Sequence, residues 1–145
     1  MAHPAGSPDP DTPVLLYDGD CGLCAGSVQF LLRHEPPHRR AALRFAPLQG
    51  AFAAQVRARH PELAGVDSLV WVDQRHHAAP VRVRSDAALQ ALTHLGGGWA
   101  VLAALGRVVP RPVRDTVYNA IARRRLSLAA PRCLLPTAEE RARFL

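Results

Sequence analysis

The sequence predicts a single α/β domain whose strands and helices follow the order β-α-β-α-β-β-α, with additional helices at the C-terminal end. Its 145 residues match the size of one domain, and a hydrophobic share of 48% can fill a sizeable core. The apolar residues alternate between short continuous runs, typical of strands, and spacings of three or four residues, typical of helices. We expect residues 1–13 to form a flexible tail and residues 14–145 to form the domain, with a helical extension from about residue 97.

The first strand and the first helix are predicted from the apolar pattern after the tail. Residues 14–17, Val-Leu-Leu-Tyr, lie between a proline and the turn-forming segment Asp18-Gly19-Asp20, as a buried strand does. From Cys21 onward, apolar residues recur at i, i+4, i+7 and i+8, the spacing of one helix face. These residues are Cys24, Val28, Leu31 and Leu32. Pro36 and Pro37 end the helix.

The middle of the chain predicts three more strands and one helix. Residues 43–46 alternate apolar and polar side chains, and an Ala-rich helix follows over residues 50–60. Residues 69–72 form a continuous apolar run, typical of a strand buried on both faces. Residues 81–84 alternate as a half-exposed strand does. The length of the connection over residues 73–80 predicts an antiparallel hairpin between these two strands.

Three helices are predicted in the C-terminal part of the chain. We expect Ser85 to cap the first, with Asp86 at the positive end of its dipole, and the glycines 96–98 to end it. Its buried face is predicted to carry Ala88, Leu92 and Leu95. An apolar helix over residues 99–105 and a last helix from Pro112 follow. The last helix carries Val113, Val117 and Ile121 at steps of four.

The basic charge of the chain does not predict a nucleic-acid partner. All 18 basic residues are arginine, which gives a net charge of +6. They are spread along the chain, and the run at residues 123–125 is shorter than the roughly five to eight residues of a nucleic-acid patch. No apolar run reaches the roughly 18 residues of a transmembrane helix, and residues 1–13 lack the apolar segment of a signal peptide. We therefore expect a cytoplasmic protein without a membrane span.

The motif Cys21-Gly22-Leu23-Cys24 stands between the first predicted strand and the helix that follows it. Two intervening residues let the first helical turn bring the two sulfurs close enough to bond. The sulfur of Cys21 faces the unpaired N–H groups and the positive end of the helix dipole, which stabilise a thiolate. We predict that Cys21 is the nucleophile of a thiol–disulfide exchange and that Cys24 is the resolving thiol.

The cysteine pair has two other interpretations. Half of a zinc site would need a second pair, but Cys133 is the only other thiol, and the seven histidines lack ligand spacing. The second alternative is two small side chains packed at a helix start. A CxxC motif beside a βαβ pattern in a cytosolic chain favours a redox-active pair of the thioredoxin-like type. Because no phosphate-binding glycine loop is present, we expect no metal, nucleotide or flavin cofactor.

Residues 17–24, Tyr-Asp-Gly-Asp-Cys-Gly-Leu-Cys, closely resemble the opening motif of the DCC family of predicted thiol-disulfide oxidoreductases. The resemblance continues in residues 44–49, 84–89 and 117–123 and ends at residues 133–136, so it covers nearly the whole chain after the tail. It implies a thioredoxin-like domain with oxidoreductase activity and leaves the substrate undefined.

The sequence departs from ordinary thioredoxins beside this motif. Their cis-proline should precede the strand near Ser68, but residues 65–67 are Gly-Val-Asp, which disfavours peptide substrates. Asp20 stands before the first cysteine, where thioredoxins carry an aromatic residue. Carboxylates oppose thiolate formation, so we expect Asp20, together with Asp18, to raise the pKa of Cys21 and give a reducing protein. Asp18 is expected to accept the proton of Cys24. The alternative role of both acids is turn formation and N-capping.

Three more residues each allow two interpretations. Cys133 is either a buried small hydrophobe or a third redox thiol that resolves or regenerates the pair. Arg44 and Arg84 point either to solvent or toward a shared anionic site.

We therefore predict an enzyme that exchanges a dithiol and a disulfide with a protein or small-molecule disulfide substrate, with a separate reductant that recycles the pair. The alternative function is a non-catalytic binding module that holds an anionic partner in the thioredoxin-like groove or on the arginine-rich surface.

Overall fold

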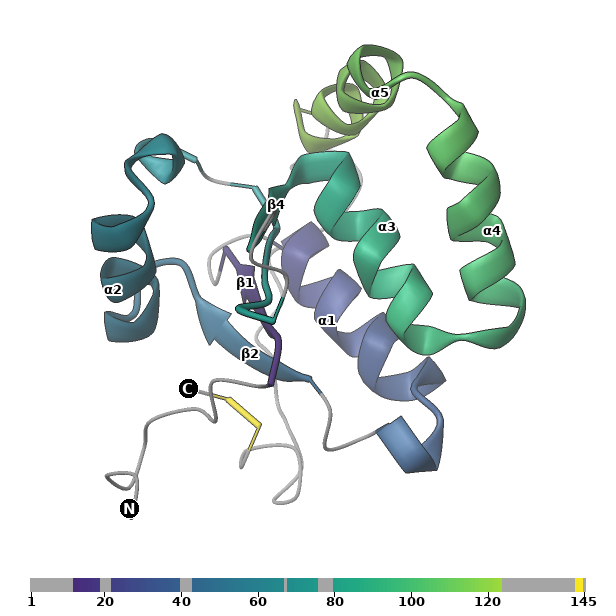
Figure 1. The fold of residues 1–145 in the computed structure, drawn as a ribbon, viewed down its shortest axis with the longest axis horizontal. Coiled ribbons are helices and arrows are strands. Elements are labelled where there is room, and N and C mark those ends of the chain that lie inside the picture. Colours follow the sequence, from purple (N-terminus) through teal and green to yellow (C-terminus); the bar gives the residue numbers. More distant parts are fainter. Residues whose placement is uncertain are drawn as a thin grey trace.

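The computed structural model describes residues 12–18, 22–39, 43–66, 68–75, 80–123 and 143–144. Of residues 22–25, 39 and 122 it describes the backbone alone. In these parts of the chain, a mixed sheet of four strands lies between helices on both of its faces (Figure 1). This arrangement confirms the predicted α/β class and is consistent with the thioredoxin-like fold.

The sheet has the strand order β2-β1-β3-β4. The strands are β1 (Val14–Tyr17), β2 (Arg44–Pro47), β3 (Val70–Val72) and β4 (Val81–Val83). β1 and β2 are parallel, whereas β1 pairs with β3 and β3 pairs with β4 in antiparallel fashion. The predicted hairpin is confirmed, and each strand lies close to its predicted position.

Helices cover the sheet unevenly. The α-helices are α1 (Gly22–His34), α2 (Ala51–Arg59), α3 (Arg84–Leu95), α4 (Gly97–Val108) and α5 (Arg111–Arg123). Two short 3₁₀ helices, η1 (Pro37–Arg39) and η2 (Pro61–Leu63), follow α1 and α2. Figure 1 shows α2 on one side of the sheet and α1 and α3 on the other, with α4 and α5 packed outside α3.

The alternation of side chains along the strands builds a core on each face of the sheet. Leu15 and Phe45 are fully buried on the face that α1 and α3 cover. Leu16 and Val70 are buried on the opposite face, together with Val56 of α2. Because both faces are covered, the strands need apolar residues at nearly every position, which explains their continuous apolar runs.

The prediction for the start of α3 is wrong in detail. Val83 occupies the N-cap position and α3 begins at Arg84, so Ser85 lies inside the first turn. The Ser85 hydroxyl donates a hydrogen bond to the carboxylate of Asp115 in α5, a partner that the local sequence does not reveal. The buried face is shifted as a result: Ser85, Ala87, Ala91 and Leu95 are buried, in place of the predicted Ala88 and Leu92. Asp86 lies in the first turn, as predicted.

Of the three glycines at residues 96–98, only the first ends α3. Gly96 is the C-cap of α3 and has a φ of 73°, in the left-handed region that favours glycine. Gly97 and Gly98 already belong to α4, so the predicted apolar helix is longer at both ends than residues 99–105. Packing of α4 against α3 provides the stability that glycine itself does not supply.

α5 forms as predicted, but its apolar stripe is not buried. Val113, Val117 and Ile121 are 52%, 54% and 45% exposed, and α4 also carries exposed apolar side chains. α5 contacts α3 through its polar side, by ion pairs that are described below. No helix within the described ranges is long and apolar enough to cross a membrane.

The last described residues of the chain lie beside β2. The N–H of Phe45 donates to the carbonyl of Arg143 at 2.9 Å, and Phe45 and Phe144 form an isolated parallel bridge. The ring of Phe144 packs against Phe45 and meets the ring of Tyr17 edge-on.

Candidate functional site

The candidate site lies where β1 ends and α1 begins. β1 ends at Tyr17 and α1 starts at Gly22, at the end of the sheet over which α5 lies in Figure 1. Cys24 is in the first turn of α1, with only its backbone described. Asp20, Cys21 and the side chain of Cys24 lie outside the described residues. The surroundings of this segment can be described from the elements next to it.

Asp18 is the predicted site residue whose side chain the structure describes. The amide Nε2 of Gln49 donates a hydrogen bond to Oδ1 of Asp18 at 2.8 Å. Gln49 reaches it because β1 and β2 are parallel, so the residues that follow them lie side by side. The N–H of Leu48 also donates to the carbonyl of Tyr17 at 2.8 Å, which holds the two strand ends together.

The role of Gln49 was not predicted. It occurs in the family-like segment of residues 44–49, but nothing in its local pattern marks it as a partner of Asp18. Only the strand topology could have pointed to Gln49, because a residue just after a strand that runs parallel to β1 lies beside the end of β1.

The segment before β3 forms the next part of the site. The N–H of Leu69 donates to the hydroxyl oxygen of Tyr118 in α5 at 3.1 Å. The carbonyl of Leu69 accepts from the N–H of Arg84 at 3.1 Å and from the hydroxyl of Ser68 at 3.3 Å. No cis peptide bond occurs within the described parts of the chain. Protein groups therefore occupy both backbone polar groups of Leu69.

Arg84 lies at the same level of the sheet as the end of β1. Leu16 of β1 pairs with Val70 of β3, which in turn pairs with Val83 of β4. Tyr17 and Arg84 each come one residue after these pairs, so they lie at the same end of the sheet. Arg84 has a φ of 53°, the only positive φ of a described residue other than glycine. Arg44 pairs with Val14 at the opposite end of β1. The two arginines therefore do not share one anionic site.

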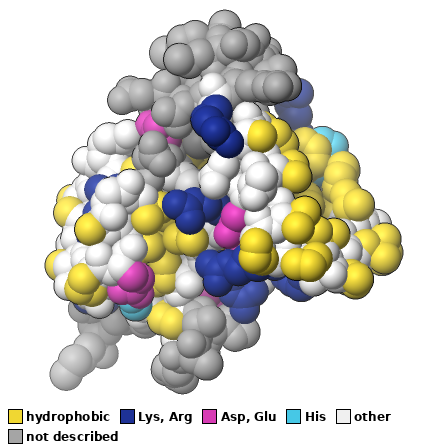
Figure 2. Space-filling view, turned by 90° about the horizontal axis from the view of Figure 1, so that it is seen from above, with side chains coloured by type: hydrophobic (Ala, Val, Ile, Leu, Met, Phe, Trp, Pro, Cys, Tyr) yellow, Lys and Arg dark blue, Asp and Glu magenta, His cyan; other side chains and the backbone are white. Residues whose placement is uncertain are grey.

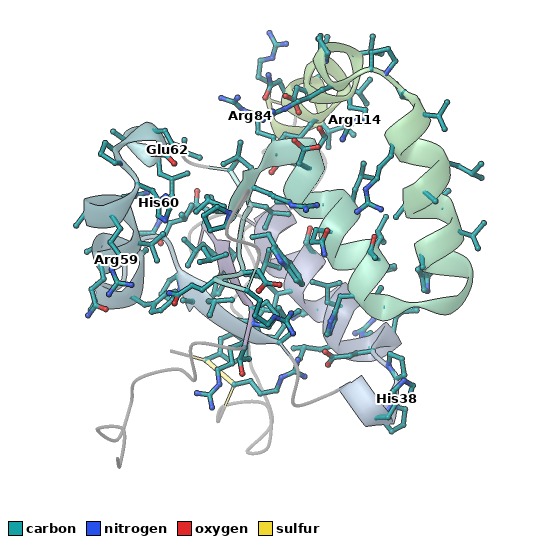
Figure 3. The ribbon with its side chains drawn as sticks, viewed as in Figure 1. His38, Arg59, His60, Glu62, Arg84 and Arg114 are labelled. Carbon is teal, nitrogen blue, oxygen red and sulfur yellow. The ribbon has the colours of Figure 1, made fainter. Side chains whose placement is uncertain are left out.

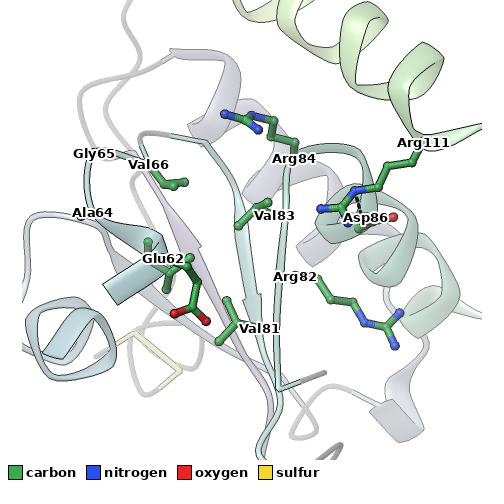
Figure 4. Close-up of a pocket in the computed structure, with 11 residues that line it drawn as sticks. Glu62, Ala64, Gly65, Val66, Val81, Arg82, Val83, Arg84, Asp86 and Arg111 are labelled. Atoms are coloured by element: carbon green, nitrogen blue, oxygen red, sulfur yellow. Dashed lines mark ion pairs between the residues drawn. The ribbon is translucent and has the colours of Figure 1, made fainter. Parts of the chain in front are cut away.

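A cavity of about 700 Å³ opens beside Arg84 (Figure 4). Its walls come from η2 and the loop after it, from β4, and from the start of α3. Apolar side chains line one part, including Leu63, Val66 and Val83, and arginine side chains line another. In the space-filling view of this end of the molecule, arginine side chains gather near the centre (Figure 2).

Ion pairs fix α5 over the start of α3. Nη1 of Arg114 lies 2.8 Å from one oxygen of Asp86, and Nε of Arg111 lies 3.0 Å from the other. Arg111 also lies 3.6 Å from Asp115, which accepts the hydrogen bond from Ser85. This network holds α5 where Tyr118 can reach the start of β3.

Two titratable groups near the site have shifted pKa values. Burial raises the pKa of Tyr17, because the phenolate would be poorly solvated at the end of β1. The pKa of Glu62 at the cavity is lowered, first by a backbone hydrogen bond to its own carboxylate and then by its contact with His60. No group of three or more metal-ligating side chains occurs within the described residues.

The remaining predicted site residue, Cys133, lies outside the described residues. Mass spectrometry of the oxidised protein, described below, distinguishes a redox role of Cys133 from a packing role.

Comparison with known proteins identifies the family. The chain is 34% identical over 135 residues to the uncharacterized protein YuxK of Bacillus subtilis (strain 168), an alignment that covers 91% of this chain and 93% of that protein. It is 27% identical over 117 residues to the chloroplastic DCC family protein At1g52590 of Arabidopsis thaliana, of which it spans 64% of the length. No solved structure gives a significant match. The model of the DCC1-like thiol-disulfide oxidoreductases matches residues 15–130. The chain therefore belongs to the family of DCC1-like thiol-disulfide oxidoreductases.

Proposed function

We propose that the protein exchanges thiols and disulfides through Cys21 and Cys24. The observation that carries this proposal is the place of the CxxC segment in the chain: it follows Asp18, next to the end of a central strand, and all of it after Cys21 belongs to the first turn of a 13-residue helix that starts at Gly22. The unpaired N–H groups at the start of such a helix favour a thiolate over a thiol. Membership of a family named for thiol–disulfide oxidoreductases supports the same chemistry.

The proposed reaction transfers two electrons from the dithiol to the substrate. The thiolate of Cys21 attacks one sulfur of the substrate disulfide, forms a mixed disulfide and releases the other half as a thiolate. The thiolate of Cys24 then attacks the sulfur of Cys21 and releases the second half. The protons of the two cysteines end on the two released thiols. A recycling reductant must then reduce the Cys21–Cys24 disulfide before the next turnover.

Asp18 is proposed to accept the proton of Cys24 before the second step. Its carboxylate is held at the end of β1 by the hydrogen bond from Gln49, six positions before Cys24 in the first turn of α1. A carboxylate fixed near a thiol can act as a general base and generate the thiolate that resolves the mixed disulfide.

Asp20 is proposed to tune the same pair. A carboxylate next to Cys21 disfavours its thiolate, which favours the disulfide over the dithiol and lowers the reduction potential. The Asp20→Asn variant should therefore have a higher reduction potential than the wild type in equilibrium with glutathione. An unchanged or lower potential would leave Asp20 with a turn-forming role only.

The exchange itself is tested with the fully reduced protein and hydroxyethyl disulfide, a neutral small disulfide. The wild type should reduce it faster than Cys21→Ser, which lacks the proposed nucleophile. Cys24→Ala should accumulate a mixed disulfide on Cys21 that mass spectrometry detects, because the proposed resolving thiol is absent. If the wild type is no faster than Cys21→Ser, the proposed exchange through Cys21 is wrong, and the alternative of a non-catalytic binding module is favoured.

Cys133→Ser serves as the matched control in this assay. Mass spectrometry of the oxidised wild type then distinguishes the two roles of the third thiol. A bond between Cys21 and Cys24 alone assigns Cys133 to packing, and a bond between Cys21 and Cys133 makes it a redox thiol.

A further inference from the structure

We infer that the cavity beside Arg84 binds a carboxylate group of the substrate, so that the protein prefers small disulfides that carry carboxylates. This inference rests on the proposed exchange reaction and adds its substrate class. Three features carry it: the backbone conformation of Arg84, the absence of a partner for its side chain among the described residues, and the place of the cavity on the sheet.

Arg84 adopts a backbone conformation that costs stability. Its φ of 53° lies in the left-handed region, where the Cβ of any residue other than glycine crowds the backbone. Asparagine or glycine would fit this junction between β4 and α3 better. Strained residues of this kind cluster at functional sites, where the position of the side chain matters more than local stability.

The guanidinium group of Arg84 is available to a ligand. Within the part of the chain that the structure describes, no hydrogen bond or ion pair engages this guanidinium group, and Arg84 is exposed. The neighbouring arginines are occupied: Nε of Arg111 lies 3.0 Å from Asp86, and Nη1 of Arg82 donates to Gln90 at 2.7 Å.

The acids of the cavity do not neutralise Arg84. Asp86 contacts both Arg111 and Arg114. Figure 4 shows the side chain of Arg84 extending away from Asp86, and the carboxylate of Glu62 turned toward the other end of the cavity. Among the described residues, Arg84 is therefore the arginine of the cavity whose whole guanidinium group is unengaged, and such a group binds a carboxylate through two parallel hydrogen bonds.

The cavity lies within reach of the proposed reaction centre. Arg84 is two strands away from the end of β1 at the same level of the sheet, a separation of about 10 Å between backbones. The arginine side chain and a short substrate arm can together span this distance. A carboxylate held by Arg84 would place the disulfide near the CxxC segment.

The same geometry favours a small molecule over an extended peptide. A peptide that binds beside β3 would need free backbone groups there, but both polar groups of Leu69 are already bonded, to Tyr118, Arg84 and Ser68. A cavity of about 700 Å³, lined in part by apolar side chains and in part by charged ones, instead matches the size of a small-molecule site.

The test compares two disulfides of similar length, the dianionic 3,3′-dithiodipropionate and the neutral hydroxyethyl disulfide. The wild type should have a higher kcat/KM for the dianion. Arg84→Gln should lower kcat/KM for the dianion roughly tenfold, the effect of one lost charge-assisted pair, and should leave the neutral substrate unchanged. Arg84→Lys should retain part of the preference, since it keeps the charge but not the paired donors.

Arg59→Gln is the matched control, because it makes the same change in net charge on an exposed residue of α2, away from Arg84 (Figure 3). It should leave both substrates unaffected. Equal rates for the two disulfides, or an equal loss with both substrates in Arg84→Gln, would overturn the inference.

A binding measurement separates this inference from the proposed reaction. In a variant with serine at all three cysteine positions, titration calorimetry should detect the binding of 3,3′-dithiodipropionate. Adding Arg84→Gln to this variant should weaken the binding roughly tenfold. If the wild type does not reduce either disulfide but this binding is present, the reaction is wrong and the carboxylate site stands. Binding that is absent or independent of Arg84 overturns the site, whatever the redox activity.

Discussion

Arg143 donates two hydrogen bonds, at 2.6 and 2.9 Å, to the carboxylate of Glu35, which lies 108 positions earlier in the chain. The side chain of Glu35 is 1% exposed, so the contact is a buried ion pair. Nε2 of His94 lies 2.7 Å from the same carboxylate, and Nε of Arg143 also donates to the carbonyl of Leu43. The C-terminal residues, the end of α1 and the end of α3 thus meet at one buried charge.

Glu35→Ala should lower the free energy of unfolding by about 3 to 5 kcal/mol, because it removes the buried carboxylate and leaves the largely buried Arg143, 14% exposed, without its counter-charge. Urea denaturation followed by circular dichroism measures the change. Glu62→Ala is the control, since its contact with His60 is at the surface, and its unfolding curve should stay close to that of the wild type. A curve for Glu35→Ala that matches the wild type would contradict a stabilising role of the pair.

Asp18→Asn should slow the resolution of the mixed disulfide more than its formation, on the order of 100-fold, since an amide cannot accept the proton of Cys24. Rapid acid quench and mass spectrometry follow both steps. Gln49→Ala removes the hydrogen bond to Asp18 and keeps the carboxylate, so its effect should be smaller but in the same direction. Equal slowing of both steps in Asp18→Asn would assign Asp18 to the shape of the turn.

Tyr17 should make the folded state sensitive to alkaline pH. Burial raises the pKa of Tyr17 above the ordinary tyrosine value of 10.0, so the unfolded chain loses this proton at lower pH than the folded one. Stability is therefore unaffected by Tyr17 below pH 10 and decreases as the pH rises above that value.

Absorbance at 295 nm can follow this ionisation, because tyrosinate absorbs there, and the sequence has only two tyrosines to separate. In Tyr118→Phe the remaining signal belongs to Tyr17 and should titrate above pH 10. Tyr17→Phe should lose less stability than the wild type between neutral and alkaline pH. A titration of Tyr17 at or below pH 10 would show that burial does not act on its hydroxyl.

Arg84→Gly should raise the free energy of unfolding by about 0.5 to 1 kcal/mol, because glycine adopts the positive φ without strain. The same variant should lose the preference for 3,3′-dithiodipropionate. Gln55→Gly in the middle of α2 is the control and should cost about 1 kcal/mol, as expected for glycine within a helix. A loss of stability in Arg84→Gly would mean that the arginine side chain supports the fold.

Much of the fold could be predicted from local patterns. The strands β1 and β3 are buried on both faces, so their sequences contain uninterrupted apolar runs with few other interpretations. The start of α3 could not be predicted in the same way. Ser85 has the local properties of an N-cap, but its hydroxyl donates a hydrogen bond to Asp115, and α3 begins one residue earlier, at Arg84, whose φ is positive.

The exposed stripe of α5 shows the same limit. Val113, Val117 and Ile121 have the spacing of a buried helix face, but burial depends on what packs against that face. The opposite, charged side of α5 contacts α3 through Arg114 and Asp86. Periodicity specifies that a helix has two sides and cannot specify which side meets the protein.

The sequence by itself determined the α/β order of elements, the family, and the place of Cys21 and Cys24 at the first junction of strand and helix, because each depends on residues that are adjacent in the chain. Only the tertiary structure decided that Gln49 holds Asp18 and that Arg84, not Arg44, lies at the same end of the sheet as the cysteine motif. The reason is physical: strand order and register place distant residues together, and hydrogen bonds between strands fix both only in the folded sheet.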